Sequence, residues 1–164
     1  MAKSDAFFIR AEVDSNGTTY TDADIDLGSF VNLGVSKSTL LRVHSVSVQI
    51  MDLNSVNPIL KDADFATHWQ LTTQDQTTIV SASDKSLVSC GSIQGKTGAY
   101  FTQDFSVNPQ TWVKGYLIAV DTMFLAVDLS VLPDSGDVTV SIVMECTLEN
   151  ATQASSTALA LSQQ

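Results

Sequence analysis

One stretch near the C-terminal end, residues 137–149, constrains the fold of this chain more than any other. Apolar side chains occupy every second position from Val138 to Leu148, and the positions between them are mostly polar. This alternation is the pattern of a β-strand with one face on a core and the other facing outward. At roughly 3.3 Å per residue the strand extends over about 35 Å, so it needs long partner strands. Val143 is the exception, an apolar residue on the outward face, and it predicts a surface that contacts a neighbouring molecule.

Shorter alternating stretches recur along most of the chain, and turn-forming residues separate them about every 8–15 residues. No internal repeat is present, which argues against propellers and solenoids. The pattern predicts an all-β protein, an antiparallel β-sandwich or barrel of about eight to ten strands with little helix. The expected strands or extended segments are residues 7–13, 21–27, 39–51, 65–71, 79–83, 86–90, 99–105, 113–120, 123–129 and 137–149.

The length of 164 residues suits one domain with a sizeable core. We expect a single β-sandwich domain over residues 1–149 and a C-terminal tail or arm over residues 150–164. This last segment is mostly Ala, Ser, Thr and Gln around Leu159 and Leu161. It is interpreted either as a tail or as an extended arm that packs on a neighbour.

The alternation in residues 39–51 contains one informative irregularity. Apolar side chains occupy odd positions up to Val43 and even positions from Val46 onward. A slip of one residue would turn every later side chain to the wrong face of the sheet. A β-bulge or a bend at His44 and Ser45 is therefore predicted.

Glycine and asparagine mark the expected turns. Asn16-Gly17 suits a type I′ turn, so a hairpin returning through residues 18–21 is predicted. Gly91, Gly95 and Gly98 predict a flexible loop, and residues 59–63 a single helical turn.

The charge balance disfavours several partners. The net charge is −10, from 18 acidic and 8 basic residues, and the basic residues are scattered along the chain. Binding of nucleic acid or of an anionic membrane needs clustered Lys and Arg, so neither is expected. No stretch approaches the roughly 20 apolar residues of a membrane helix, and membrane insertion is not expected. The first five residues are polar, so no signal peptide is expected.

Three aspartates, Asp22, Asp24 and Asp26, alternate with apolar residues and raise the question of a Ca²⁺ site. An EF-hand loop beginning at Asp22 would need Gly at Leu27 and Glu at Leu33, so that motif is excluded. The plain interpretation is a strand with an acidic outer edge. A looser cation site is the alternative, because like charges two residues apart on one face repel each other.

Residues able to carry catalysis are sparse, and no enzymatic activity, catalytic residue or cofactor is expected. His44 and His68 lie in no nucleophile or triad motif. Cys90 and Cys146 have no metal-binding spacing, and we expect two buried free thiols, with one disulfide as the alternative.

Several segments together resemble the single jelly-roll coat proteins of small viruses. The resemblance rests on residues 6–13, on residues 24–32 (DIDLGSFVN) running into residues 40–52 (LLRVHSVSVQIMD), and on residues 115–129 and 138–148. It implies a jelly-roll sandwich that works as a self-assembling shell subunit, a viral capsid protein located in the virion. The implied partners are copies of the same chain and other virion proteins.

Two features depart from that family. Many such coat proteins have a basic N-terminal arm, whereas residues 1–5 contain a single lysine, Lys3. This departure leaves direct genome binding in doubt. The short link Asp121-Thr122 is typical of a meander, whereas jelly-roll strands cross between sheets. Either the link is a bend, or the fold is another sandwich.

The expected contact regions between subunits are Leu159, Leu161, Val143 and the acidic segment that holds the three aspartates. The alternative function is a monomeric or low-oligomer carbohydrate-binding or adhesion module, in which exposed aromatic side chains stack on sugars. Trp112, Tyr116 and Tyr100 are the candidates for that role.

Overall fold

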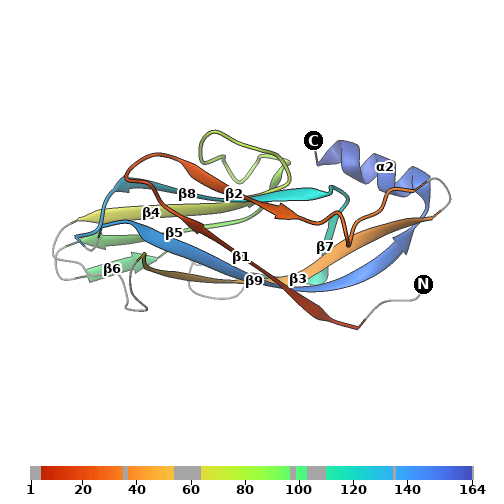
Figure 1. Cartoon of the computed structure of the whole chain (residues 1–164), viewed down its shortest axis with the longest axis horizontal. Coiled ribbons are helices and arrows are strands. Elements are labelled where there is room, and N and C mark those ends of the chain that lie inside the picture. The colour runs from red at the N-terminus through yellow and green to blue at the C-terminus, as the bar shows by residue number, and fades with distance from the viewer. Residues whose placement is uncertain are drawn as a thin grey trace.

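The computed structural model describes residues 5–34, 37–53, 64–96, 99–102, 110–134 and 136–163, with side chains omitted at 96 and 99–102. Two β-sheets lie face to face, and one helix packs at one end of the sandwich (Figure 1). The elements are β1 (Phe7–Asp14), β2 (Thr21–Asp26), β3 (Ser38–Asp52), β4 (Phe65–Thr72), β5 (Leu87–Lys96), β6 (Ala99–Thr102), β7 (Gln110–Ile118), β8 (Thr122–Val131), β9 (Val138–Ala151) and α2 (Gln153–Ser162).

The strand order identifies the fold as a jelly roll. One sheet has the order β1-β9-β3-β7 and the other the order β2-β8-β4-β5-β6, and every pair is antiparallel. With β6 set aside as an added edge strand, eight strands remain, four in each sheet, and the chain repeatedly crosses between the sheets. This arrangement is that of a jelly roll, and it confirms the predicted all-β fold.

The strand predicted from the strict alternation is β9, and it lies in the middle of its sheet. It pairs with β1 on one side and with β3 on the other. Its inward residues from Val138 to Cys146 are at most 1% exposed. The outward residues between them are half-buried, with Val143 opposite Arg10 on one neighbour and Ser47 on the other.

The bulge predicted in β3 is present. The register of β3 shifts between Val43 and Ser45 against both β9 and β7. His44 is the additional residue, and its Nε2 atom lies 2.9 Å from Oγ1 of Thr147. The bulge keeps Val43 and Val46 both in the core, which resolves the phase slip seen in the sequence.

The short link before Thr122 is a bend and not a hairpin. β7 belongs to one sheet and β8 to the other, so residues 119–121 carry the chain across the sandwich. The carbonyl of Asp121 accepts a hydrogen bond of 2.7 Å from the backbone N–H of Leu27. Of the two interpretations of this link, the structure supports the one compatible with a jelly roll.

The prediction of a hairpin at Asn16-Gly17 is wrong. A turn does form there, with Thr19 N–H donating to the Asn16 carbonyl at 3.2 Å, but β1 and β2 then continue in different sheets. Gly17 has a φ of +60°, whereas no described residue other than glycine has a positive φ. Type I′ needs positive φ at both central residues, so this turn is of another type.

The prediction of a flexible loop around the glycines is also wrong, because Gly91 and Gly95 lie within β5. They stand opposite Trp69 and Phe65 of β4. A Cβ on Gly95 would collide with the Phe65 ring, so the absent side chain makes room for an aromatic one. Gly98 and the helical turn expected at residues 59–63 lie outside the described residues.

The core fills the space between the sheets and is contributed by both of them. Its largest fully buried side chains include Trp69 and Leu71 from β4, Met123 and Leu125 from β8, and Met144 from β9. Side chains from both sheets thus form one hydrophobic core.

Candidate functional site

The helix α2 covers one end of the four-stranded sheet from outside. Thr152 caps its N-terminus by accepting a hydrogen bond from the backbone N–H of Ser155. On its inner side Ala160 packs with Leu40 and Ala119 in a small cluster separate from the main core. Residues 153–162 of the segment expected to be a tail or arm are therefore helical and pack on their own subunit.

The helix ends in a polar anchor, the side chain of Gln163. Its amide nitrogen donates to the carbonyl of Leu117 at 2.6 Å, and its amide oxygen accepts from the N–H of Ala119 at 3.0 Å. Its backbone carbonyl accepts from the hydroxyl of Thr73 at 2.7 Å. Gln163 is only 3% exposed, so these bonds form away from solvent and fix the end of α2 to the end of β7.

A groove of about 840 Å³ lies between α2 and the sheet. Its apolar wall is formed by Leu40, Leu117, Ala151 and Leu159. Leu159 thus packs within its own subunit, whereas Leu161 is 65% exposed. Of these two predicted contact residues, only Leu161 leaves most of its surface uncovered.

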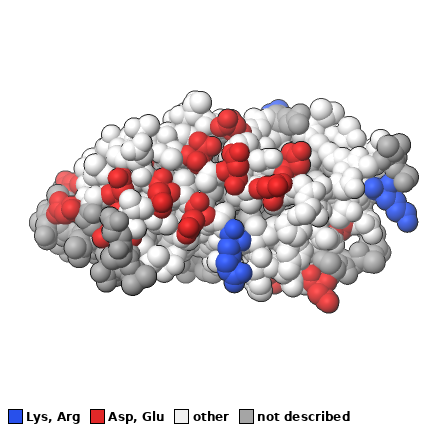
Figure 2. Space-filling model, in the orientation of Figure 1, with Lys and Arg blue, Asp and Glu red and all other residues white. Residues whose placement is uncertain are grey.

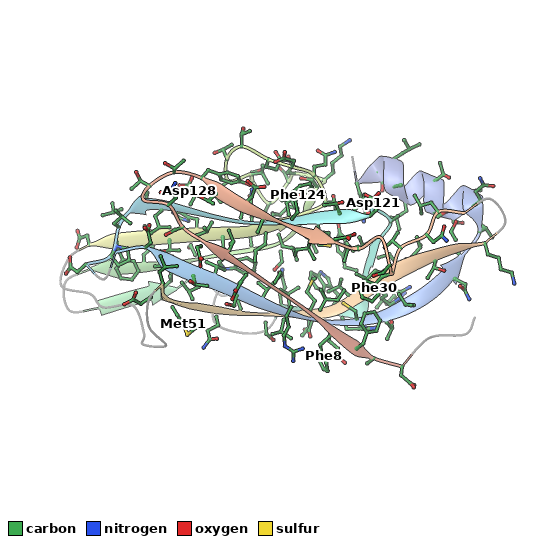
Figure 3. All side chains as sticks on the ribbon, in the orientation of Figure 1. Phe8, Phe30, Met51, Asp121, Phe124 and Asp128 are labelled. Atoms are coloured by element: carbon green, nitrogen blue, oxygen red, sulfur yellow. The ribbon has the colours of Figure 1, made fainter. Side chains whose placement is uncertain are left out.

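The third predicted contact residue, Val143, lies on the outer face of the four-stranded sheet. It is half-buried between Arg10 of β1 and Ser47 of β3. The Arg10 guanidinium lies 5.8 Å from the ring centroid of Phe8, which is 57% exposed. Figure 3 shows Phe8 pointing away from the sandwich. The outward residues of β1 also include Glu12 and Asp14, so this face combines apolar, basic and acidic side chains.

The three aspartates of β2 form an exposed row along one edge of the five-stranded sheet. Asp22, Asp24 and Asp26 point outward, about 7 Å apart at two residues per repeat. Asp26 also accepts a hydrogen bond of 2.8 Å from the N–H of Gly28. In the part of the chain that the structure describes, no three His, Cys, Asp or Glu side chains are placed to hold a metal ion.

The acidic row belongs to a wider acidic surface. Figure 2 shows Asp and Glu gathered over the β1 and β2 region, with few basic residues among them. Burial raises the pKa of Asp22, and the nearby carboxylates of Asp75 and Asp24 raise it further. Burial also raises the pKa of Tyr20, whose hydroxyl lies in the same negative field. Desolvation is thus the first cause of both pKa shifts, and repulsion by neighbouring carboxylates adds to it.

Asp22→Asn is expected to stabilise the protein slightly at pH 7, by less than about 1 kcal/mol, because Asp22 is mostly exposed to solvent. The raised pKa means that the folded state binds the Asp22 proton more tightly than the unfolded state does. The destabilisation by this carboxylate therefore exists above the raised pKa and disappears as pH falls through it. Melting temperatures from about pH 4 to pH 8 measure the effect.

The matched control for this prediction is Asp64→Asn, which removes the same charge from an exposed position that precedes β4. An equal gain in both variants would show that net charge, and not the local repulsion at Asp22, sets the stability. Repeating the Asp22 series with millimolar Ca²⁺ tests the cation-site hypothesis, since a bound ion would raise the melting temperature of the wild type more than that of the variant.

Both cysteines are free thiols. Burial, together with the charge of Glu145, raises the pKa of Cys146 to about 12, and burial also raises that of Cys90. A raised thiol pKa lowers the fraction of reactive thiolate. His68 lies on the outward side of β4, opposite Asp128 of β8 and Ser92 of β5, whereas His44 belongs to the other sheet.

The two candidates for sugar stacking whose side chains are described do not form an open platform. Trp112 and Tyr116 of β7 contact each other with centroids 5.7 Å apart and ring planes inclined by 57°. Both are half-buried and pack against the main core. The side chain of Tyr100 lies outside the described residues. The described aromatic pair is therefore more a part of the core than a binding surface.

Sequence reasoning missed two polar contacts, one on each sheet. Arg42 and Glu149 form a nearly buried ion pair of 2.6 Å, although they are 107 residues apart. Gln70 is fully buried and bonds to Tyr20, Thr78 and Val80. Neither contact leaves a signal in the sequence, because each joins residues from different elements.

None of the helices in the described ranges has the length and hydropathy needed to span a membrane. No protein-family model matches the sequence. No curated protein matches it either.

Solved structures that resemble this chain include VP1 capsid proteins of polyomaviruses. One is VP1 of human polyomavirus 12 in complex with 3'-sialyllactosamine, 8% identical, with a TM-score of 0.49, covering 90% of this chain and 99% of that one. Another is Merkel cell polyomavirus VP1 in complex with disialyllactose, 9% identical, with a TM-score of 0.36, covering 90% and 95%. A third is VP1 of trichodysplasia spinulosa-associated polyomavirus, 12% identical, with a TM-score of 0.30, covering 87% and 94%. Likeness at this level carries no argument about function, and the jelly-roll assignment rests on the strand order.

Proposed function

We propose that this chain is a structural subunit of a self-assembling shell, a viral capsid protein without catalytic activity that resides in the virion. The observation that carries the proposal is the exposure of large apolar side chains on both edge strands of one sheet. Phe8 of β1 is 57% exposed, and Val113 of β7 is completely exposed. A subunit of a closed shell must contact neighbours on more than one side, and such contacts are built on buried apolar anchors.

The outer face of α2 offers a third contact region. Leu161 is exposed there, and the helical period places Ala154, Thr157 and Ala158 on the same side. Small side chains around one large apolar side chain allow close approach of a neighbouring surface. The proposed partners are therefore further copies of this chain, with other virion proteins as additional neighbours.

Direct binding to the genome is not part of the proposal. The Lys and Arg residues do not form a cluster in the sequence, and the face over β1 and β2 is acidic (Figure 2). Phosphate groups would be repelled by such a face. Neutralisation of a packaged genome is assigned to another component.

The proposal is tested by measuring the size of the purified full chain at about 10–50 μM, by light scattering and negative-stain microscopy. Large particles of uniform size are the expected result. A single monomeric peak contradicts the proposal. Quenching of tryptophan fluorescence by sugars in that monomer supports the carbohydrate-binding alternative instead.

Leu161→Glu is expected to raise the concentration needed for particle formation by about tenfold or more, because it places a charge in the proposed contact on α2. The matched control is Thr18→Glu, which adds the same charge at an exposed turn between β1 and β2. The contact assigned to α2 is wrong if both variants assemble like the wild type while they retain its melting temperature.

A further inference from the structure

The strand β1 forms an open edge of the four-stranded sheet. In the described part of the chain it pairs with β9 on one side and with no strand on the other. It runs across the front of the molecule in Figure 1. Its outward residues are exposed, and its inward residues Phe7, Ile9 and Ala11 are only half-buried at the rim of the core. An open edge with uncovered apolar side chains is a template for pairing with another strand.

We propose that β1 pairs antiparallel with β1 of a second copy, so that the two four-stranded sheets join into one continuous sheet across a two-fold axis. This inference rests on the proposed function, since it names one of the contacts between shell subunits. The charges along β1 indicate that the strand pairing with this edge is β1 of a second copy.

The geometry of antiparallel pairing limits the possible registers. Directly opposite residues either exchange both backbone hydrogen bonds or exchange none. Alternate residues of β1 already point their backbone groups toward β9, so two opposite residues must have the same parity. In a pair formed by two copies of β1, each register is described by the sum of the residue numbers of two directly opposite residues. Because the two residues have the same parity, this sum must be even. The same rule keeps inward side chains opposite inward side chains.

Two allowed registers pair seven residues of each β1 strand, and their charges distinguish them. A sum of 20 places Arg10 opposite Arg10 of the second copy, and like charges directly opposite destabilise a pair. A sum of 22 places Arg10 opposite Glu12 of the second copy, and symmetry produces this attraction twice. The registers with sums of 18 and 24 pair only five residues of each strand, and a sum of 24 sets Glu12 opposite Glu12 besides Arg10 opposite Asp14. Of the two registers that pair seven residues, only the one centred on Ala11 is therefore complementary in charge.

This register also covers the apolar rim. Ile9 comes opposite Val13 of the second copy, and Ala11 comes opposite its own counterpart, so the inward row continues across the axis. The acidic row on the neighbouring strand β2 opposes association at long range, because each copy has a net charge of −10. Pairing is therefore expected to strengthen as salt screens that repulsion, since the opposed ion pairs act at short range.

The test uses charge reversal in the full chain at about 0.3 M salt. Arg10→Glu and Glu12→Arg should each raise the dissociation constant of a dimer about tenfold or more, measured by analytical ultracentrifugation. The double swap Arg10→Glu/Glu12→Arg restores opposite charges in the same register and should recover dimerisation. Loss of dimerisation in the swap as well overturns the proposed pairing.

Cysteine substitutions test which residues lie opposite each other, independently of the dissociation constant. Ala11→Cys should form a disulfide between two copies in an oxidising buffer, because the two Cβ atoms lie about 5 Å apart at the axis. Arg10→Cys should not, since it crosslinks in the register with a sum of 20. Crosslinking of Arg10→Cys in preference to Ala11→Cys would overturn the assigned register.

The outcomes for this contact and for the proposed function are separate. Large particles that are insensitive to all these variants overturn the β1 contact and leave the shell function standing. A wild type that stays monomeric at all concentrations overturns both. Dimers without particles contradict the shell, and they support the β1 contact if Arg10→Glu dissociates them and the double swap restores them.

Discussion

Arg42→Met is expected to lower the free energy of unfolding by about 2–3 kcal/mol, because it leaves Glu149 charged and unpaired in a nearly buried place. The Nε atom of Arg42 donates to Oε2 of Glu149 at 2.7 Å, and the two side chains are 13% and 11% exposed. Arg42 also donates to the carbonyl of Lys114. A denaturant titration at neutral pH measures the loss as a shift of the midpoint at an unchanged slope.

The matched control is the double variant Arg42→Met/Glu149→Leu, which replaces the whole ion pair with apolar side chains. We expect it to cost about 1 kcal/mol or less, since no unpaired charge remains. A double variant as unstable as the single one would show that Arg42 acts through another contact. Its bond to Lys114 and its position against Gly115, which has a φ of +73°, would then be the cause.

Gln70→Leu is expected to cost about 2–3 kcal/mol, because it removes three hydrogen bonds from a fully buried amide. The amide nitrogen donates to the hydroxyl of Tyr20 and to the carbonyl of Thr78, both at 3.0 Å. The amide oxygen accepts from the N–H of Val80 at 2.8 Å. These bonds hold residues 78–80 over the outer side of β4, so amide hydrogen exchange at Val80 should accelerate more than exchange in β9.

Gln76→Leu is the control for this prediction. The amide of Gln76 makes one hydrogen bond of 3.1 Å, to the hydroxyl of Ser86, and its side chain is only half-buried. We expect it to cost less than about 1 kcal/mol and to leave exchange at Val80 unchanged. Equal losses in the two variants would contradict the role assigned to Gln70.

The parts of the fold that follow from local alternation could be predicted from the sequence. β9 is present as expected, and the phase slip in β3 located the bulge at His44. Both predictions are confirmed because one face of each strand lies on the core. Apolar residues therefore recur at every second position of the sequence. The bend before Thr122 was one of two interpretations, because a short link is compatible with either a meander or a crossing.

The parts that depend on distant partners could not be predicted. Glycine weakens a strand, so Gly91 and Gly95 predict a loop from sequence alone. The structure places them in a strand because aromatic side chains lie opposite them, and the ring of Phe65 occupies the space above Gly95. The helix α2 was missed because its Ala, Ser and Thr residues show little apolar periodicity. Its position is determined by Gln163, whose partners Leu117 and Ala119 lie on β7 and just beyond it.

The candidate site was predictable only as a set of surface residues. Val143, Leu161 and the three aspartates are at least partly accessible on outward surfaces, as alternation and composition indicated. Leu159 could not be separated from Leu161 by sequence, because only the packing of α2 shows which side of the helix is covered. The open edge of β1 was likewise invisible until the strand order was known.

The central place of β9 has a consequence for how the chain is made. β9 separates β1 from β3, yet it begins 131 residues after Phe7, the first residue of β1 (from 7 to 138). At a synthesis rate of roughly 5–20 residues per second, β1 emerges about 7–26 s before the strand it pairs with. Until then the strand between β1 and β3 is absent from the four-stranded sheet. The sandwich can therefore form completely only after nearly the whole described chain has left the ribosome. In such a nascent chain β1 and β3 have unpaired edges, which can pair wrongly with other nascent chains on the same mRNA. The risk of aggregation is therefore greatest late in synthesis.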